Sequence, residues 1–149
     1  MRIEPVSKPH RDSWLALRIA LWPDEDTTVL AEDVDRMIAT PDADRPAWLA
    51  IDESGVIGFA EAALRRDYVN GCETSPVAFL EGIYVAPQAR RQGIGRSLDR
   101  TVRDWAMLRG CREYASDALI DNRESYAFHA ALGFEETERV VYFRRRLDA

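Results

Sequence analysis

A short stretch rich in arginine and glycine has the residue types that phosphate binding requires. The segment RRQGIG, residues 90–95, places two arginines before a G-x-G pair, and an apolar helical pattern begins at Ile94. Glycines let successive backbone N–H groups face one ligand, and a helix N-terminus adds unpaired donors and a partial positive charge. Arg90, Arg91 and Arg96 can add charge-assisted hydrogen bonds to phosphate oxygens. A flexible turn that carries surface arginines is the alternative.

Two carboxylates stand at positions where acid–base chemistry is expected. Glu81 interrupts the apolar run Phe79–Ile83, and Asp117 directly follows a second predicted strand. An ionised carboxylate inside a buried strand is costly unless it has a partner or a task. A buried salt bridge for Glu81 and a helix cap for Asp117 remain open as structural alternatives.

Two aromatic residues are candidates for the wall of a ligand site. Trp22 ends a predicted helix, and Tyr68 precedes the Asn70-Gly71 turn. Aromatic side chains combine a large apolar surface with a polar tip, which suits the wall of a site for a partly polar ligand. Core packing explains Trp22 equally well.

The elements that must position these residues alternate along the chain. Apolar periodicity predicts an α/β or α+β single domain over residues 1–149 with a mixed sheet. The predicted strands are Ile3–Val6, Ala47–Ile51, Val56–Leu64, Phe79–Val85, Glu113–Ser116 and Val140–Arg145. The predicted helices are Asp12–Trp22, Thr28–Thr40, Ile94–Arg109 and Arg123–Leu132.

The composition limits the classes of partner. The net charge of −6 argues against nucleic acid, because neutralising phosphates requires a basic face. Residues 24–53 carry ten carboxylates and two arginines, which is either a solvated surface or a field that attracts a cationic ligand. No apolar run reaches a membrane span and the N-terminus lacks a signal-peptide core, so we expect no membrane association and a cytoplasmic location. Two cysteines and two histidines give no metal-ligand spacing, so no metal is expected.

The motifs resemble those of the GNAT acetyltransferases. Arg90-x-x-Gly93-x-Gly95 after a strand resembles the acyl-CoA motif of that superfamily, and Asn122 with the segment from His129 to Phe134 is similar to its N…Y-x-x-x-G-F segment. Longer segments resemble the aminoglycoside 6′-N-acetyltransferases. They are Leu21–Pro23, Arg66–Cys72, Ser75–Val77, Phe79–Ile83, Ala115–Asp117 and Leu132–Arg139.

The resemblance implies a sheet flanked by helices and splayed between two parallel strands, Phe79–Val85 and Glu113–Ser116, with acetyl-CoA as co-substrate. The pantetheine arm is then expected beside Asn122 and His129, paired with the backbone of Ile83, Tyr84 and Val85. The pyrophosphate is expected at Arg90, Arg91, Gln92, Gly93, Ile94, Gly95 and Arg96.

The resemblance also implies the chemistry. The amine is expected to attack the thioester directly, so Cys72 and Cys111 are predicted to be dispensable. Glu81 and Asp117 are expected to bind the substrate ammonium groups and to relay a proton. Many GNAT enzymes carry a tyrosine where this chain has His129, and Tyr126 lies one helical turn earlier. Tyr126 is therefore the preferred general acid, if one is needed.

The predicted function is acetyl transfer to the 6′-amine of aminoglycoside antibiotics, an antibiotic-resistance activity. The acceptor is expected to contact Trp22, Tyr68, Glu81, Asp117 and Glu138. A GNAT enzyme that acts on a polyamine, another small molecule or a protein amine is the alternative, followed by a non-catalytic acyl-CoA-binding module. The resemblance also implies a homodimer, and residues 140–143, Val-Val-Tyr-Phe, are apolar on both faces of the predicted last strand.

Overall fold

The computed structural model describes residues 1–148, in two compact units that divide after Asp117. The first unit holds a five-stranded sheet in the order β1-β2-β3-β4-β5. The neighbours from β1 to β4 are antiparallel, and β4 and β5 are parallel. The strands are β1 (Arg2–Pro5), β2 (Ala47–Asp52), β3 (Gly55–Arg65), β4 (Val77–Val85) and β5 (Tyr114–Ala115). The predicted fold class, a mixed α/β sheet with one parallel pair, is confirmed.

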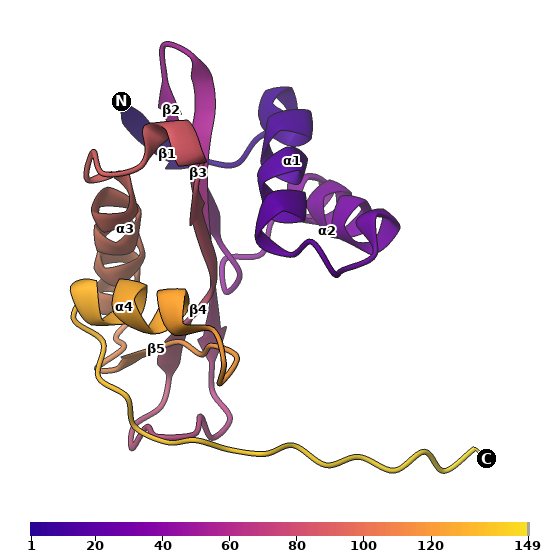
Figure 1. Cartoon of the computed structure of the whole chain (residues 1–149), viewed down its shortest axis with the longest axis vertical. Helices are drawn as coiled ribbons and strands as arrows, with labels where there is room; N and C mark the ends of the chain where they lie inside the picture. The colour runs from indigo at the N-terminus through magenta and orange to yellow at the C-terminus, as the bar shows by residue number, and fades with distance from the viewer. Residues whose placement is uncertain (149) are drawn as a thin grey trace. The chain divides into compact units, whose positions relative to one another are not determined.

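Helices cover both faces of this sheet. Helices α1 (Arg11–Leu21) and α2 (Thr27–Ala39) lie on one side, and α3 (Ile94–Leu108) lies on the other (Figure 1). Two 3-10 turns, η1 (Lys8–His10) and η2 (Pro87–Ala89), lead into α1 and toward α3. Of the helices in residues 1–148, none is long and apolar enough to cross a membrane.

The core explains why α1 and α2 pack on the sheet. Trp14 and Val34, from the two helices, are fully buried with Leu49 and Phe59 of β2 and β3. On α3 the buried residues recur at helical spacing, as Ile94, Leu98, Val102 and Ala106. Each apolar stripe faces the sheet, so burial holds the helices where the sequence periodicity predicts them.

Over residues 118–148, the second unit contains one helix. The Asn122 side chain accepts a hydrogen bond from the Ser125 N–H at 3.2 Å and thereby caps α4 (Arg123–Ala131). Gly133, with a φ of +92°, adopts the left-handed conformation that commonly ends a helix.

Two strand predictions need correction. The predicted Val140–Arg145 strand is wrong: residues 134–148 contain neither helix nor strand, and Tyr142 and Phe143 are exposed. An extended segment becomes a strand only when its N–H and C=O groups find a partner ladder, and none pairs with it in residues 1–148. The predicted strand Glu113–Ser116 is reduced to the two residues of β5.

Candidate active site

The loop rich in arginine and glycine joins the end of β4 to the start of α3. Arg91 and Gly93 both have left-handed backbone conformations, with φ of +64° and +79°. Gly93 is the residue before the helix and offers no side chain to cap it. An added Cβ at Gly93 would meet nothing within 4 Å, so the space beside this helix N-terminus is open. The first N–H groups of a helix have no acceptor within the helix, so those of α3 are available to bind an anion in this space.

The arginines of this loop are available to a ligand to different degrees. Arg91 and Arg96 are exposed, as is Gln92, whereas the side chain of Ile94 is buried in the core. The Nε–H of Arg90 donates to the carbonyl of Val85 at 2.9 Å. Its guanidinium also lies 5.3 Å from the centre of the Tyr84 ring. Arg90 is therefore anchored to the end of β4 through its Nε–H group and its contact with Tyr84.

A β-bulge determines how Glu81 is presented. Glu61 pairs with Gly82, and Ala62 pairs with Leu80, so Glu81 is an extra residue on β4. A bulge re-aims the side chain and interrupts the ladder. The Glu81 side chain is 33% exposed and its carboxylate binds Arg65 at 2.9 Å. The expectation that Glu81 lies in a buried strand is corrected: the bulge turns this carboxylate toward solvent.

Glu81 and Asp117 occupy matching places on neighbouring parallel strands. The pairing of β4 with β5 ends at Phe79 and Ala115. Glu81 and Asp117 each lie two residues beyond that last pair, and β4 continues while β5 stops. Open sheets commonly bind ligands at the carboxyl ends of neighbouring parallel strands. Both residues are exposed there.

A cavity of about 600 Å³ brings two predicted site residues together. Trp22 and Glu81 both line it, and Asp33 and Asp42 add carboxylates to its wall. Its complete lining is Arg18, Trp22, Asp33, Arg36, Met37, Thr40, Pro41, Asp42, Ala43, Arg45, Glu61, Ala62, Ala63 and Glu81. Tyr68 and Asp117 are not part of this lining, and Tyr68 is 75% exposed.

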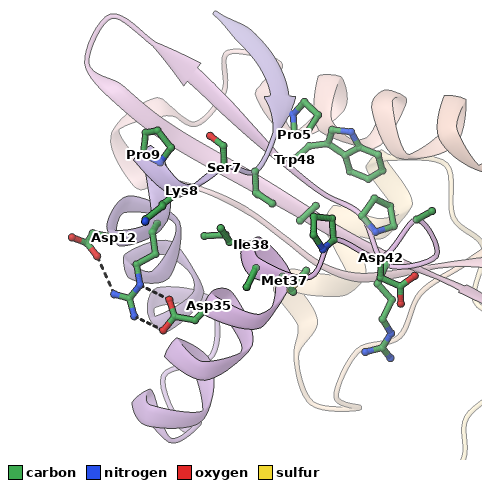
Figure 2. Close-up of a pocket in the computed structure, with 18 residues that line it drawn as sticks. Pro5, Ser7, Lys8, Pro9, Asp12, Asp35, Met37, Ile38, Asp42 and Trp48 are labelled. Carbon is green, nitrogen blue, oxygen red and sulfur yellow. Dashed lines mark hydrogen bonds and ion pairs between the residues drawn. The ribbon is translucent and has the colours of Figure 1, made fainter.

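A larger cavity of about 1230 Å³ contains none of the predicted site residues. It lies between the start of α1, the end of α2 and the segment leading into β2 (Figure 2). At its edge Arg11 forms two hydrogen bonds with Asp35, at 2.8 and 3.1 Å. Trp48 and Ile38 form part of its apolar wall. Carboxylates line both cavities, and Glu81, the predicted catalytic carboxylate, lines the smaller one.

Three of the four predicted residues of the second unit have partners within that unit. The Tyr126 hydroxyl donates to the carbonyl of Ile120. His129 Nδ1 lies 2.7 Å from the carbonyl oxygen of Ser125 and 3.1 Å from its hydroxyl. Asn122 caps α4, and Glu138 is exposed in the segment that follows the helix.

A loop rich in arginine and glycine between a strand and a helix also occurs in known protein families. The sequence matches the model of the acetyltransferase (GNAT) family over residues 10–134. The chain belongs to this family. The family predicted from the R-x-x-G-x-G segment is thereby confirmed, and the matched range includes the loop, Glu81 and Asp117.

Individual relatives agree over nearly the whole chain. An aminoglycoside N(6′)-acetyltransferase type 1 from Acinetobacter genomosp. 13 is 50% identical over 147 residues, which cover 99% of both chains. The apo crystal structure of an aminoglycoside antibiotic 6′-N-acetyltransferase from Acinetobacter haemolyticus is 42% identical, with a TM-score of 0.93 and coverage of 99% and 100%. The structure of AAC(6′)-Iy with the bisubstrate analogue CoA-S-monomethyl-acetylneamine is 41% identical, with a TM-score of 0.88 and 97% of each chain covered.

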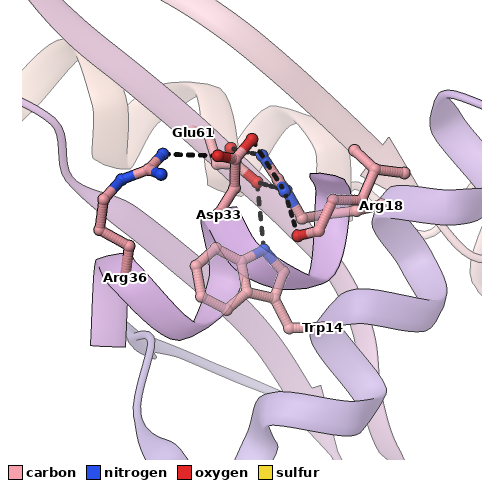
Figure 3. Close-up of polar contacts among 6 residues, drawn as sticks. Trp14, Arg18, Asp33, Arg36 and Glu61 are labelled. Atoms are coloured by element: carbon pink, nitrogen blue, oxygen red, sulfur yellow. Dashed lines mark hydrogen bonds and ion pairs between the residues drawn. The ribbon is translucent and has the colours of Figure 1, made fainter. Parts of the chain in front are cut away.

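This GNAT chain also contains a buried ion pair that the sequence analysis missed. Glu61 of β3 is 5% exposed, and its carboxylate accepts hydrogen bonds from Arg18 Nε at 2.8 Å and Nη2 at 3.1 Å (Figure 3). It also accepts one from Trp14 Nε1 at 3.1 Å. Burial raises the pKa of Glu61, and these hydrogen bonds act in the opposite direction. The available signal was a lone glutamate inside the apolar strand GVIGFAEAALR.

The two cysteines have the properties of structural thiols. Burial raises the pKa of Cys72 and of Cys111 above the ordinary value for a thiol. A nucleophilic cysteine needs a lowered pKa, because the thiolate is the reactive form. Within residues 1–148, no group of three or more His, Cys, Asp and Glu side chains is arranged to hold a metal ion.

Proposed function

We propose that this protein is an acetyl-CoA-dependent aminoglycoside 6′-N-acetyltransferase. The observation that carries the proposal is the 50% identity, over 99% of both chains, with an aminoglycoside N(6′)-acetyltransferase type 1. A relative of similar length binds an analogue that joins coenzyme A to an acetylneamine, so one site accommodates both substrates there. The activity predicted from the motifs agrees with the activity for which these relatives are named. We further propose that residues 1–149 form one catalytic domain.

The chain has groups suited to acetyl-CoA. The open N-terminus of α3, with Gly93 before it, fits a pyrophosphate, and Arg90, Arg91 and Arg96 supply positive charge. The backbone of Ile83–Val85 is proposed to pair with the pantetheine arm. The remaining proposed contacts are Gln92, Ile94, Gly95, Asn122 and His129. When bound, acetyl-CoA supplies the activated acetyl group.

The acetyl group is proposed to pass directly from the thioester to the amine, without a covalent acyl-enzyme. The neutral 6′-amine attacks the thioester carbonyl and a C–N bond forms; the C–S bond then breaks and coenzyme A leaves as a thiolate. The acetylated nitrogen gives up its second proton to solvent, so the product is a neutral amide. The ammonium form must first lose a proton, and Glu81 and Asp117 are the proposed acceptors, directly or through water. Tyr126 is the proposed proton donor to the thiolate, in a supporting and dispensable role, because a coenzyme A thiol is acidic enough to leave with little help.

The acceptor is proposed to bind through aromatic and acidic side chains. The cavity that Trp22 and Glu81 share supports this assignment, since it offers an apolar ring beside a carboxylate. Asp117, Tyr68 and Glu138 are proposed to contact other amines of the polycationic acceptor. The net charge of −6 favours such a cation, and nucleic acid and membranes are not proposed as partners.

The protein is proposed to act as a homodimer in the cytoplasm, where its co-substrate is available. Support for the dimer comes from the exposed apolar residues near the C-terminus, where Val141 is 77%, Tyr142 82%, Phe143 91% and Leu147 92% exposed. A chain that exposes this much apolar surface gains from pairing with another. Light scattering at micromolar concentration tests this, and a monomer would refute the dimer.

The decisive experiment measures acetyl-CoA turnover as free thiol, with neamine, its 6′-hydroxyl analogue, a polyamine and a peptide as acceptors. We expect fast turnover with neamine and little with the 6′-hydroxyl analogue, and NMR of the product should locate the acetyl group on the 6′-nitrogen. Acetylation at another amine would refute the regiochemistry. Preferred turnover of the polyamine or the peptide would assign the enzyme to another acceptor class.

A further inference from the structure

The buried pair of Arg18 and Glu61 connects three elements around the acceptor cavity. Glu61 fixes the guanidinium of Arg18 to β3 through two hydrogen bonds, at 2.8 and 3.1 Å. Arg18 Nη1 donates to the carbonyl of Leu30 on α2 at 2.9 Å. Arg18 is itself part of α1 and is 5% exposed. One guanidinium therefore joins two helices and the central strand.

The same guanidinium contacts Trp22. Its central carbon lies 5.0 Å from the centre of the Trp22 ring, within the range of a cation–π interaction. The far edge of the indole lies against Gly82, where an added Cβ would be 2.6 Å from Cζ2 of Trp22. Phe59 contacts the indole edge-on, with ring centres 6.0 Å apart. The indole is therefore confined between Arg18, Phe59 and the backbone next to Glu81.

Stability alone is a weak reason for such a pair. Removing two charges from water carries a large desolvation cost, and replacing a buried ion pair with well-packed neutral side chains often leaves stability unchanged or improved. The pair instead fixes the position of the Arg18 guanidinium and of the ring that it contacts. The planar fork of an arginine can hold a carboxylate with its donors while its face contacts a ring.

We propose that Arg18 and Glu61 are positioning residues for the acceptor: together they hold the Trp22 indole against Gly82 and so shape the cavity wall beside Glu81. The inference rests on the proposed function, because it takes Trp22 as part of the acceptor site. Arg18 and Glu61 also line the cavity, but each is only 5% exposed and their polar atoms are hydrogen-bonded to one another. Arg18 therefore acts through Trp22, and Glu61 acts through Arg18. Arg18 contacts Glu61, Leu30 and Trp22 and not the loop at residues 90–96, so we expect the effect on the acceptor.

The test uses the double variant Arg18→Met with Glu61→Gln. This change removes both charges together, and the glutamine oxygen can still accept the hydrogen bond from Trp14 Nε1. We expect a folded protein whose KM for neamine rises about tenfold, which corresponds to about 1.4 kcal/mol. The KM for acetyl-CoA should stay unchanged. If the variant does not fold, Arg18→Lys replaces it, because lysine keeps the charge and loses the planar contact with Trp22.

A matched control exists on the same two helices. Arg11 and Asp35 also join α1 to α2 by two hydrogen bonds, and neither lines the cavity of Trp22 and Glu81. The variant Arg11→Met with Asp35→Asn should leave the KM for neamine unchanged. An equal rise in both double variants would show a general loosening of the helices and overturn the proposal.

A spectroscopic measurement separates this inference from the proposed function. The chain has four tryptophans, so labelling with 5-fluorotryptophan gives four ¹⁹F resonances, and Trp22→Phe identifies the one from Trp22. In the Arg18 and Glu61 double variant we expect the Trp22 resonance to shift and broaden without any substrate present. An unchanged Trp22 resonance would refute the positioning role whatever the activity. If wild-type enzyme fails to acetylate neamine, the proposed function fails while the resonance still decides this inference.

Discussion

Replacing Gly82 with alanine tests how tightly Trp22 is packed. Gly82 lies on β4 opposite Glu61, directly after the bulged Glu81. An alanine Cβ would lie 2.6 Å from Cζ2 and 2.9 Å from Cη2 of Trp22, and 3.1 Å from Cδ2 of Leu21. Carbon atoms pack best at about 3.5–4.0 Å, so the indole must move by roughly 1 Å.

Two opposing contributions determine how much Gly82→Ala changes the free energy of unfolding. Overpacking a filled site costs about 1–3 kcal/mol. Replacing a glycine inside a strand with alanine stabilises the folded state by about 0.5–1 kcal/mol, because alanine loses less backbone entropy than glycine on folding. The clash is the larger of the two, so we expect Gly82→Ala to lower the free energy of unfolding by about 1–2 kcal/mol. In a chain of this size that corresponds to a fall in Tm of roughly 2–8 °C.

Urea unfolding, followed by circular dichroism, measures this loss, and a double-mutant cycle assigns it to Trp22. In a Trp22→Leu background the two closest contacts are gone, so Gly82→Ala should cost little or become stabilising. The cycle should therefore give a coupling energy of about 1 kcal/mol or more, as expected for residues in contact. An equal loss in both backgrounds would refute the packing argument, since the cost would then arise elsewhere in β4.

Four further predictions concern the cofactor loop, the catalytic groups and a buried acid. Gly93→Asp should raise the KM for acetyl-CoA about tenfold or more in a folded protein, because it places a carboxylate where phosphate is expected; unchanged affinity would refute the phosphate site. Glu81→Gln should lower kcat by roughly 10²–10⁴-fold if this carboxylate accepts the proton, with acetyl-CoA binding intact by calorimetry; a normal kcat would contradict that role. Tyr126→Phe and His129→Ala should both retain acetyl transfer, with the larger loss in Tyr126→Phe; a large loss confined to His129→Ala would reverse this ranking. Asp99 lies on α3 and is 1% exposed. Burial raises its pKa, so between the ordinary and the raised pKa the folded state holds a proton that the unfolded chain has lost, and stability falls as pH rises through this range. Asp99→Asn removes this titration, so its stability relative to wild type should rise with pH from the ordinary Asp pKa to the raised one; parallel urea-unfolding curves across this range would contradict the assignment.

Much of the region proposed to bind acetyl-CoA was predictable from local sequence. Periodicity predicts the strand that ends at Val85 and the helix that begins at Ile94, and Gly93 and Gly95 predict the loop between them. Backbone conformation there depends mainly on neighbours in the chain. The structure confirms a helix that begins at Ile94, and a left-handed φ at Gly93. Pro23 likewise marks the end of α1, which stops at Leu21. The family itself could be predicted from the same motifs.

The region proposed to bind the acceptor was decided by the tertiary structure. The exposure of Glu81 depends on the register between β3 and β4, which is set by pairing with residues about twenty positions away. The partners of Glu61 are Arg18 and Trp14 on α1, which lie 43 and 47 residues away in the sequence, so no local pattern predicts how the Glu61 carboxylate is paired. The predicted strand at Val140–Arg145 failed for the same reason. Apolar alternation marks a segment able to pair, but a strand exists only where another backbone satisfies its hydrogen bonds.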